Sequence, residues 1–347
     1  MNLFKLFTTK LPLSASGLYN LGNTCFMNSI IQCLAHTPTL YEFALSYRFS
    51  SFETTSQKNQ IFTQNLTESL IELIQLIHSG NEPIKPVMFY EVFAQINAKY
   101  RKKQQRDAAE FLMLLFEVMD NDTRNLSLAQ PPPIIHIGEY YDKYRIFMEA
   151  NFSITTMMFN GMTVVKNKCS KCPHQHISFE PFTVLELPIP TDLEYLKIVD
   201  PFHYIDHENL DYITVYDCLN NYYYSKSSCP SCETSFSSEK QFVVTPPILV
   251  IQFLRFTITK SKPKKDERFI YFPLQNLSIG KAEYELYATV EHTGNTNSGH
   301  YVANCIIDDK WYRFNDDKVS EIDKKEIVSK NSYLLFYKRM PNSMKKK

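Results

Sequence analysis

The chain has 347 residues, of which 44% are hydrophobic and 14% aromatic, enough for the core of one large domain or two. Its 37 basic and 37 acidic residues give a formal net charge of zero, so a nucleic-acid polyanion is not expected as its main partner. No apolar run approaches the roughly 20 residues of a membrane span, and no membrane association is expected.

The N-terminal stretch MNLFKLFTTKLPL has neither the continuous apolar segment nor the small-residue cleavage site of a secretory signal. We therefore expect residues 1–16 to form an N-terminal extension of a protein located in the cytoplasm, the nucleus or both. The stretch has lysines and no acidic residue, which leaves a transit peptide as the alternative.

The stretch GLYNLGNTCFMNSIIQCLAH, residues 17–36, raises the question of what Cys25 does. Polar residues precede this cysteine, while Ile30, Ile31 and Leu34 follow it at the spacing of a buried helical face. The pattern predicts a helix that begins at Cys25, where the helix dipole and free backbone N–H groups favour a thiolate. A nucleophile and a buried structural cysteine both fit this stretch.

The first third of the chain is predicted to be helical. Apolar residues recur at helical period in QNLTESLIELIQLIHS, and PVMFYEVFAQI begins with a proline that suits a first helical turn. A further helix is predicted in DAAEFLMLLFEVMD, where Asp107 and Glu110 have capping-box spacing and an inner face is expected at Phe111, Leu114, Leu115 and Val118. The three prolines of residues 125–135 predict a linker.

The C-terminal half is predicted to consist mainly of strands. Apolar and polar residues alternate over 284–291, and ILVIQFLRF is a continuous apolar run that suits a strand buried on both faces. HYVANCII and SYLLFYK predict two more strands, whereas KSKPKKDER, residues 260–268, is expected to be a solvated loop. The predicted fold class is therefore α+β, with a helical lobe followed by a sheet-rich lobe.

Four of the eight cysteines form two C-x-x-C pairs, CSKC at 169–172 and CPSC at 229–232. Each pair can bring two thiolates to one tetrahedral ion, so Cys169, Cys172, Cys229 and Cys232 are predicted to hold a structural Zn²⁺. Free or redox-active thiols are the alternative, and two nearby histidines could substitute as ligands: His174 and His176. A closed four-sulfur site has no open position for chemistry.

A cysteine nucleophile needs a base and an acceptor that orients the base. His300 follows a polar turn and opens a predicted strand, and Asn315 ends a short aromatic strand that can pair with it. Such pairing would bring the Asn315 oxygen to the imidazole and fix its tautomer. Because neighbouring side chains on a strand point to opposite faces, only one of Asn315 and Asp316 can lie beside His300.

These residues carry a resemblance to a known family. GLYNLGNTCFMNSIIQCL resembles the cysteine box of the ubiquitin-specific proteases, and SGHYVANC followed by WYRFNDDKV resembles their histidine box. Supporting blocks occur in the order of the family: QQRDAAEFL, the two C-x-x-C pairs, PPILVIQFLRF, FIYFPLQNL and SYLLFYKR. The resemblance spans residues 17–338, nearly the whole chain.

The resemblance implies a papain-like cysteine protease fold with a helical thumb, a β-rich palm and zinc-bearing β fingers. Residues 17–338 would form the catalytic domain, with a thumb-like helical lobe at 17–124 and the palm and fingers at 150–338. Residues 339–347 would be a basic tail. The implied activity is thiol-dependent hydrolysis of the isopeptide or peptide bond after the C-terminal Gly-Gly of ubiquitin, through a thioester.

The family motifs also imply the roles of individual residues. Cys25 matches the nucleophile, His300 the general base and later acid, and Asn315 the orienting third member. Asn20 matches the side chain that helps to form the oxyanion hole, together with the Cys25 backbone N–H. Asn315 supplies no negative charge, so Asp316 is expected to contribute electrostatically.

Contacts with ubiquitin are implied for Gln105, Asp107, Glu110 and Tyr301. The first three match the block that binds the basic tail of ubiquitin, where carboxylates can pair with arginine, and Asp107 is also expected to cap a helix. Arg106 departs from the family pattern, because it brings positive charge toward a basic tail. Ubiquitin and ubiquitinated proteins are the implied partners, and an activating partner protein is a further candidate.

A catalytically impaired ubiquitin-binding scaffold is the alternative function, because the same residues could be present but misaligned. A zinc-dependent nucleic-acid module is disfavoured by the zero net charge and by the lack of an aromatic and basic stripe around either cysteine pair. The sequence does not specify a linkage type or a protein substrate.

Overall fold

The structure is a computed structural model. It describes residues 15–46, 65–124, 138–191, 212–259, 262–296 and 298–341, so the predicted linker at 125–135 lies outside the described residues. The chain divides into two compact units. The first comprises Met1–Leu128, Tyr287–Gly294 and Ser298–Ile327, and the second Ala129–Leu286, Asn295–Asn297 and Val328–Lys347.

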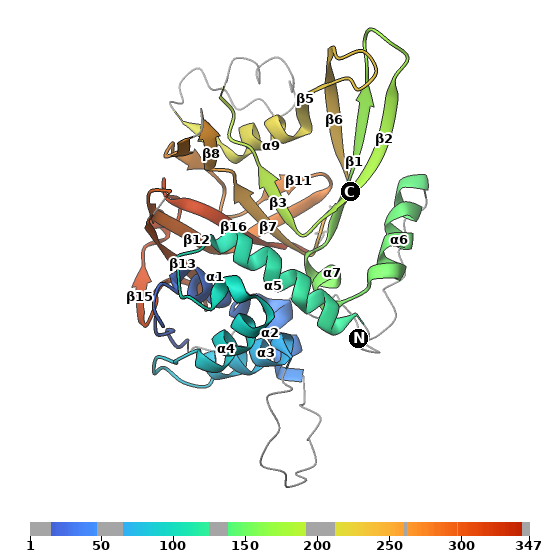
Figure 1. Ribbon diagram of the computed structural model, residues 1–347. Helices are drawn as coiled ribbons and strands as arrows, with labels where there is room; N and C mark the ends of the chain where they lie inside the picture. The colour runs from blue at the N-terminus through green and yellow to red at the C-terminus, as the bar shows by residue number, and fades with distance from the viewer. Residues whose placement is uncertain are drawn as a thin grey trace, which may run out of the picture. The chain divides into compact units, whose positions relative to one another are not determined.

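The first unit contains the helices predicted for the first third of the chain (Figure 1). They are α1 (Cys25–Ala35), α2 (Pro38–Ser46), α3 (Leu66–Ile77), α4 (Val87–Ile96) and α5 (Ala108–Thr123), with a 3₁₀ turn at Ala98–Tyr100. Pro86 lies at the N-cap of α4 and not inside its first turn. The predicted inner face of α5 is only partly right: Leu114 and Val118 are half-buried, because the helix also buries Leu112 and Phe116.

Helix α1 is buried along its whole length. Phe26, directly after Cys25, packs edge-on against Phe111 of α5, with ring centroids 5.6 Å apart. Further aromatic rings continue this cluster, since Phe93 contacts both Phe111 at 4.9 Å and Tyr100 at 4.7 Å. Buried aromatic pairs of this kind fix the rotation of a helix, so the start of α1 is held in place by α5, which packs in turn against α4.

Four antiparallel strands complete the first unit: the end of β12 (Ala282–Gly294), β13 (Gly299–Ile307), β14 (Lys310–Asn315) and β15 (Lys318–Ile322). They lie in the order β15-β14-β13-β12. The predicted pairing of the strand that begins near His300 with the strand that ends at Asn315 is confirmed, with Ala303 opposite Phe314. The alternation predicted for β12 holds only over its first half, because both faces are buried from Tyr287 to His292.

The second unit contains a four-stranded antiparallel sheet in the order β2-β1-β6-β5. Its strands are β1 (Gly161–Lys168), β2 (Gln175–Phe182), β5 (Tyr224–Ser228) and β6 (Ser235–Val244). The helices of this unit are α6 (Glu139–Asn151), α7 (Ile154–Phe159) and α9 (Val215–Tyr223). Helix α6 contributes Tyr144 and Met148 to a small core with Met162, Val164 and Val243 of the sheet.

A second set of strands in this unit follows the order β16-β7-β3, with β3 (Val184–Leu187), β7 (Ile248–Phe253) and β16 (Ser332–Arg339). Every residue of β7 is buried, as its continuous apolar sequence predicts. Short pairings complete the unit: β4 (Ile213–Thr214) with β10 (Ile270–Tyr271), and β11 (Leu277–Ile279) with the start of β12.

The prediction of a loop at 260–268 is wrong in part. Residues Lys262–Lys265 form β9, which pairs antiparallel with β8 (Phe256–Thr259) as a two-stranded ribbon. An edge strand tolerates proline and exposed lysine, since one side of its backbone needs no partner strand. Composition alone therefore did not distinguish this edge strand from a loop.

None of the helices in the described part of the chain combines the length and apolar character needed to cross a bilayer.

Arg255 is a fully buried cation in the second unit. Its replacement tests how much its hydrogen bonds stabilise that unit. Its guanidinium donates to three carbonyl oxygens, those of Ser332 at 2.8 Å and of Asp266 and Arg268 at 2.9 Å each. Because Arg255→Ala leaves these acceptors unpaired, we expect the free energy of unfolding to fall by about 3 kcal/mol in chemical denaturation. The control is Arg145→Ala on α6, which removes an exposed, ion-paired arginine and should change the free energy of unfolding by less than about 1 kcal/mol. Equal effects of the two variants would contradict the prediction.

Candidate active site and metal site

Cys25 is the first residue of α1, as the sequence predicts, and its side chain is 3% exposed. The loop before it is folded around the side chain of Asn20. The Oδ1 atom of Asn20 accepts hydrogen bonds from the backbone N–H groups of Gly22 at 2.9 Å and Thr24 at 3.1 Å. Asn20 thus gives the turn before the helix its shape and holds its own amide group close to the start of α1.

His300 lies near the start of β13, and Asn315 is the last residue of β14. The Nε2 atom of His300 is 2.7 Å from Oδ1 of Asn315, so this nitrogen carries the proton and donates. The second ring nitrogen is then free to interact with the Cys25 side chain, which has the largest influence on the pKa of His300. The side chains predicted as nucleophile, base and acceptor are thus neighbours in the structure.

The interaction with Cys25 is the main reason why the pKa of His300 is raised from 6.5 to about 9. The hydrogen bond with Asn315 and the negative charge of Asp316 also raise it, whereas partial burial lowers it. These contacts favour the imidazolium form, which can later donate a proton.

Asp316 adopts a left-handed backbone conformation with φ of 53°. Its side chain therefore leaves the Asn315 face of the hairpin and lies against the segment before α1. Its carboxylate accepts from Asn20 Nδ2 at 3.0 Å and from Asn28 Nδ2 at 2.8 Å. Asn315 is accordingly the residue beside His300, and Asp316 contacts the side chain predicted for the oxyanion hole.

Among the residues predicted to bind ubiquitin, Gln105 contacts the residue before His300, and Tyr301 contacts Asp107. Gln105 makes two hydrogen bonds to the backbone of Gly299, through Nε2 to the carbonyl at 2.9 Å and through Oε1 from the N–H at 3.2 Å. Tyr301 donates its hydroxyl proton to Oδ2 of Asp107 at 3.2 Å. Burial raises the pKa of Tyr301, so its hydroxyl stays protonated and remains a donor.

Asp107 is the N-cap of α5, as predicted. Its Oδ1 accepts from the backbone N–H groups of Ala109 and Glu110 at 2.9 Å each. Glu110 is exposed on the first turn and forms an ion pair with Lys99. Arg106 donates to the carbonyl of Lys99 at 2.8 Å, and its guanidinium lies 5.9 Å from the centre of the Tyr100 ring.

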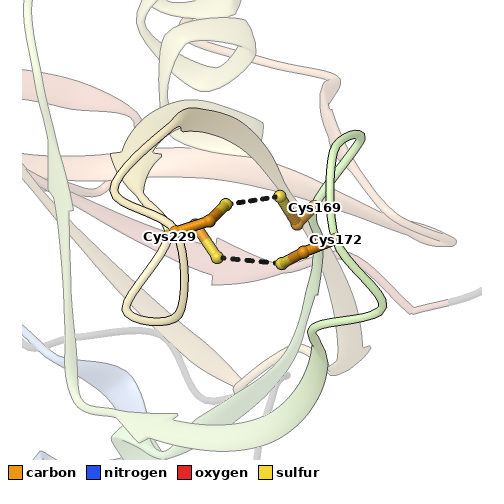
Figure 2. A group of neighbouring side chains, drawn as sticks. Cys169, Cys172 and Cys229 are labelled. Atoms are coloured by element: carbon orange, nitrogen blue, oxygen red, sulfur yellow. Dashed lines mark hydrogen bonds between the residues drawn. The ribbon is translucent and has the colours of Figure 1, made fainter.

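The four paired cysteines of the second unit form one cluster. Cys169 and Cys172 lie between β1 and β2, and Cys229 and Cys232 lie between β5 and β6, so each pair caps a β-hairpin (Figure 2). All four Sγ atoms lie within 4.8 Å of one another. This group could hold a metal ion.

The sulfur spacing fits a tetrahedral ion. Cys169 Sγ is 3.6 Å from Cys232 Sγ, and Cys172 Sγ is 3.7 Å from Cys229 Sγ. Four thiolates about 2.3 Å from one Zn²⁺ would be about 3.8 Å apart. The predicted substitute ligands His174 and His176 are not part of the cluster, and the His174 ring lies 3.3 Å from the hydroxyl of Ser231.

A family model described as ubiquitin carboxyl-terminal hydrolase matches residues 16–337. The chain belongs to this family. Among its relatives, ubiquitin carboxyl-terminal hydrolase 21 of Homo sapiens is 29% identical over 93% of this chain, and that of Rattus norvegicus is 30% identical over the same share. Ubiquitin carboxyl-terminal hydrolase 2 of Bos taurus is 29% identical, again over 93% of this chain.

The chain spans 61% of the length of the hydrolase 21 relatives and 54% of hydrolase 2 from Bos taurus. The fold is similar to that of the SAGA Ubp8/Sgf11/Sus1/Sgf73 DUB module bound to ubiquitin aldehyde, with a TM-score of 0.67 at 23% identity. That match covers 96% of this chain and 71% of the other. The predicted α+β fold of the ubiquitin-specific proteases is therefore confirmed.

Two contacts of this hydrolase site were not predicted from the sequence. One is the hydrogen bond from Asn28 to Asp316, and the other is the pair of bonds between Gln105 and Gly299. A signal existed for the first, because Asn28 follows Cys25 by three residues and so lies on the same side of the helix. The second depends on a backbone partner, which sequence patterns do not specify.

The raised pKa of His300 makes a testable prediction. In NMR titrations the imidazole should titrate near pH 9, and Cys25→Ala should shift the midpoint back toward 6.5, because it removes the largest cause of the rise. The control is Ser29→Ala, a buried position of the same helix, which should leave the midpoint unchanged. A midpoint near 6.5 in the unmodified protein would contradict the geometry.

The same shift links His300 to stability. Because its pKa is higher in the folded than in the unfolded state, its contribution is complete below about pH 6.5 and is lost as the pH rises through about 9. The loss of stability on His300→Ala should therefore be larger at pH 6 than at pH 10.

Proposed function

We propose that this chain is a deubiquitinating cysteine protease, which hydrolyses the isopeptide or peptide bond after the C-terminal Gly-Gly of ubiquitin. The observation that carries the proposal is that the His300 imidazole is hydrogen-bonded to Asn315 and interacts with the Cys25 side chain closely enough to raise the pKa of His300. Family membership supports the substrate class, since the matched family is that of ubiquitin carboxyl-terminal hydrolases. The aligned triad favours an enzyme over the alternative of an impaired scaffold.

In the proposed reaction, Cys25 and His300 share one proton. The Cys25 thiolate attacks the carbonyl carbon of the last ubiquitin glycine, and the imidazolium of His300 gives its proton to the departing amine as the C–N bond breaks. The neutral imidazole then takes a proton from water, and the resulting hydroxide attacks the thioester. Breaking of the C–S bond releases ubiquitin and restores the thiolate and the imidazolium.

The negative oxygen of each tetrahedral intermediate needs hydrogen-bond donors. We assign this role to the backbone N–H of Cys25 and to the side-chain amide of Asn20. The amide has two N–H groups, of which one donates to Asp316, so the other can serve the oxyanion. The carboxylate of Asp316 thereby orients the donor and adds negative charge near the imidazolium.

We propose that Asp107 and Glu110 receive the basic tail of ubiquitin. Asp107 is fixed by the helix N-terminus and by Tyr301, whereas the ion pair of Glu110 with Lys99 is exposed and can exchange for an arginine of the substrate. Gln105 and Tyr301 would flank the tail beside His300. A narrow passage there selects glycine, because any Cβ would collide with its walls.

A ubiquitin that carries a C-terminal electrophile tests the function. Intact mass should rise by one ubiquitin per chain, and peptide mapping should place the bond on Cys25. Cys25→Ala should abolish labelling, whereas Cys33→Ala, a buried cysteine of the same helix, should leave it intact.

A fluorogenic ubiquitin-amide separates the enzyme from the scaffold. The protease should release the fluorophore, and a scaffold would bind ubiquitin without turnover. Labelling that persists in Cys25→Ala would overturn the assignment of the nucleophile. Turnover that rises on addition of a cellular fraction would indicate the activating partner allowed by the sequence.

We further propose that the cysteine cluster holds a structural Zn²⁺. The four thiolates of Cys169, Cys172, Cys229 and Cys232 match the soft ligand set of a closed zinc site, and their spacing fits its tetrahedral geometry. The ion would join the two hairpin tips and carry no chemistry, because no coordination position remains open.

Metal analysis should find one zinc per chain, and chelation or Cys229→Ser should lower the melting temperature and weaken ubiquitin binding. Small-molecule alkylation of Cys25 should change little, because the thiol belongs to the first unit. Ser231→Ala, an exposed residue of the same loop, is the matched control and should retain the metal. A fold and a ubiquitin affinity that are both insensitive to chelation would contradict the zinc site.

A further inference from the structure

Asn28 lies three residues after Cys25 on α1, and its side chain is 2% exposed. Its Nδ2 group donates to Oδ1 of Asp316 at 2.8 Å and to the carbonyl of Leu18 at 3.1 Å, and the carbonyl of Tyr19 lies at 3.4 Å. Asn28 thus connects the catalytic helix, the loop before it and the turn that follows β14.

Three oxygen atoms determine how the Asn28 amide is turned. If the amide were flipped, its Oδ1 would face a carboxylate and two carbonyls, and like partial charges would repel. In the observed orientation Oδ1 is buried and accepts no hydrogen bond from the described residues. An unpaired buried acceptor costs free energy. The hydrogen bonds that Nδ2 donates to Asp316 and to the loop therefore stabilise this orientation by more than that cost.

Asp316 connects Asn28 to the residues around the reacting groups. Its second carboxylate oxygen accepts from Nδ2 of Asn20 at 3.0 Å, and its backbone carbonyl accepts from the N–H of Leu18 at 2.9 Å. The preceding residue, Asn315, holds His300. One carboxylate therefore lies between the buried amide of Asn28 and the amide assigned to the oxyanion hole.

We propose that Asn28 is a positioning residue for the hydrolysis, which fixes the Asp316 carboxylate so that the Asn20 amide is held in place for the oxyanion. The inference rests on the proposed function. Asn28 does not touch the substrate or the reacting atoms, and it acts only through Asp316. Without its donor, the carboxylate can rotate about its side-chain bonds, and the Nδ2 end of the Asn20 amide then loses its fixed acceptor, although Oδ1 stays bound to the loop.

This role differs from a merely structural one in what it predicts for the kinetics. Oxyanion stabilisation is needed only in the transition state, so its loss lowers kcat and leaves KM nearly unchanged. A misplacement of about 1 Å can cost about 10²-fold in rate. The interaction between Cys25 and His300 does not involve Asn28, so the intrinsic reactivity of the thiol should persist.

The test measures kcat and KM for a fluorogenic ubiquitin-amide together with the rate of Cys25 alkylation by iodoacetamide. Asn28→Ala should lower kcat by about 10²-fold, with KM and alkylation close to those of the unmodified protein. Ser29→Ala is the matched control, because Ser29 is also 2% exposed and, among the described residues, its hydroxyl donates only to the carbonyl of Phe26 in its own helix. It should lower kcat by less than about twofold.

A double-mutant cycle with Asn20 tests the pathway. If Asn28 acts through Asp316 on Asn20, the Asn20→Ala variant should lose little more activity when Asn28→Ala is added. Additive losses in kcat would overturn the proposal, as would a loss confined to KM or an equal loss in Ser29→Ala. If Asn28→Ala does not fold, Asn28→Ser keeps a polar side chain at the position, and the same results are expected for its kcat, KM and alkylation rate.

Failure of the proposed function is recognised separately, because the unmodified protein would then leave the ubiquitin-amide intact. The contact itself is still tested by thermal unfolding of Asn28→Ala, Asp316→Ala and the double variant. The melting temperature of the double variant should lie above the value expected from adding the two single losses. Additive losses would overturn the inference whatever the activity.

Discussion

The geometry of the candidate active site depends on the docking of the turn after β14 onto the segment before α1. The N–H of Leu18 donates to the carbonyl of Asp316, and the Asp316 carboxylate accepts from Asn20 and Asn28. Gly17 makes the approach feasible, because a Cβ at this position would lie 2.5 Å from the backbone oxygen of Asp317. Because Asn315 immediately precedes this turn, docking it also sets the distance between the thiol and the imidazole. Two parts of the chain far apart in sequence are thus joined by a few hydrogen bonds around one carboxylate.

Much of the site could be predicted from the sequence, because it depends on local patterns. A polar turn before an apolar helical face places Cys25 at a helix N-terminus, and a short antiparallel hairpin brings Asn315 to His300. The contacts of Asn28 and Gln105 could not be predicted in this way, since their partners are a turn and a backbone from other elements. The direction of the Asp316 side chain depends on a positive φ that no residue pattern indicated. The boundaries of the lobes at 17–124 and 150–338, and a location in the cytoplasm or nucleus, stay predictions.

In the fold, too, features that depend on local sequence patterns were predicted, whereas features that depend on distant partners were not. The two C-x-x-C pairs predict one shared metal site, and the sulfur atoms lie at the separation expected for ligands of one ion. The buried strand β7 was predicted from its apolar run, whereas β9 was mistaken for a loop because it is short, charged and contains Pro263. Strand β12 is polar at Glu291 yet buried there, because Arg313 pairs with this carboxylate at 3.3 Å. The burial of the Glu291 carboxylate therefore depends on a partner residue from another strand, which the residue pattern of β12 does not indicate.

The central claim is that His300 activates Cys25 in the folded chain. It is tested most directly by the rate at which a small uncharged electrophile alkylates Cys25 at pH 7, followed by intact mass and peptide mapping and compared with the rate in His300→Ala. A free cysteine is only a few per cent thiolate at this pH, so the account predicts that the variant reacts about tenfold more slowly or worse. Equal rates in the two proteins would contradict it.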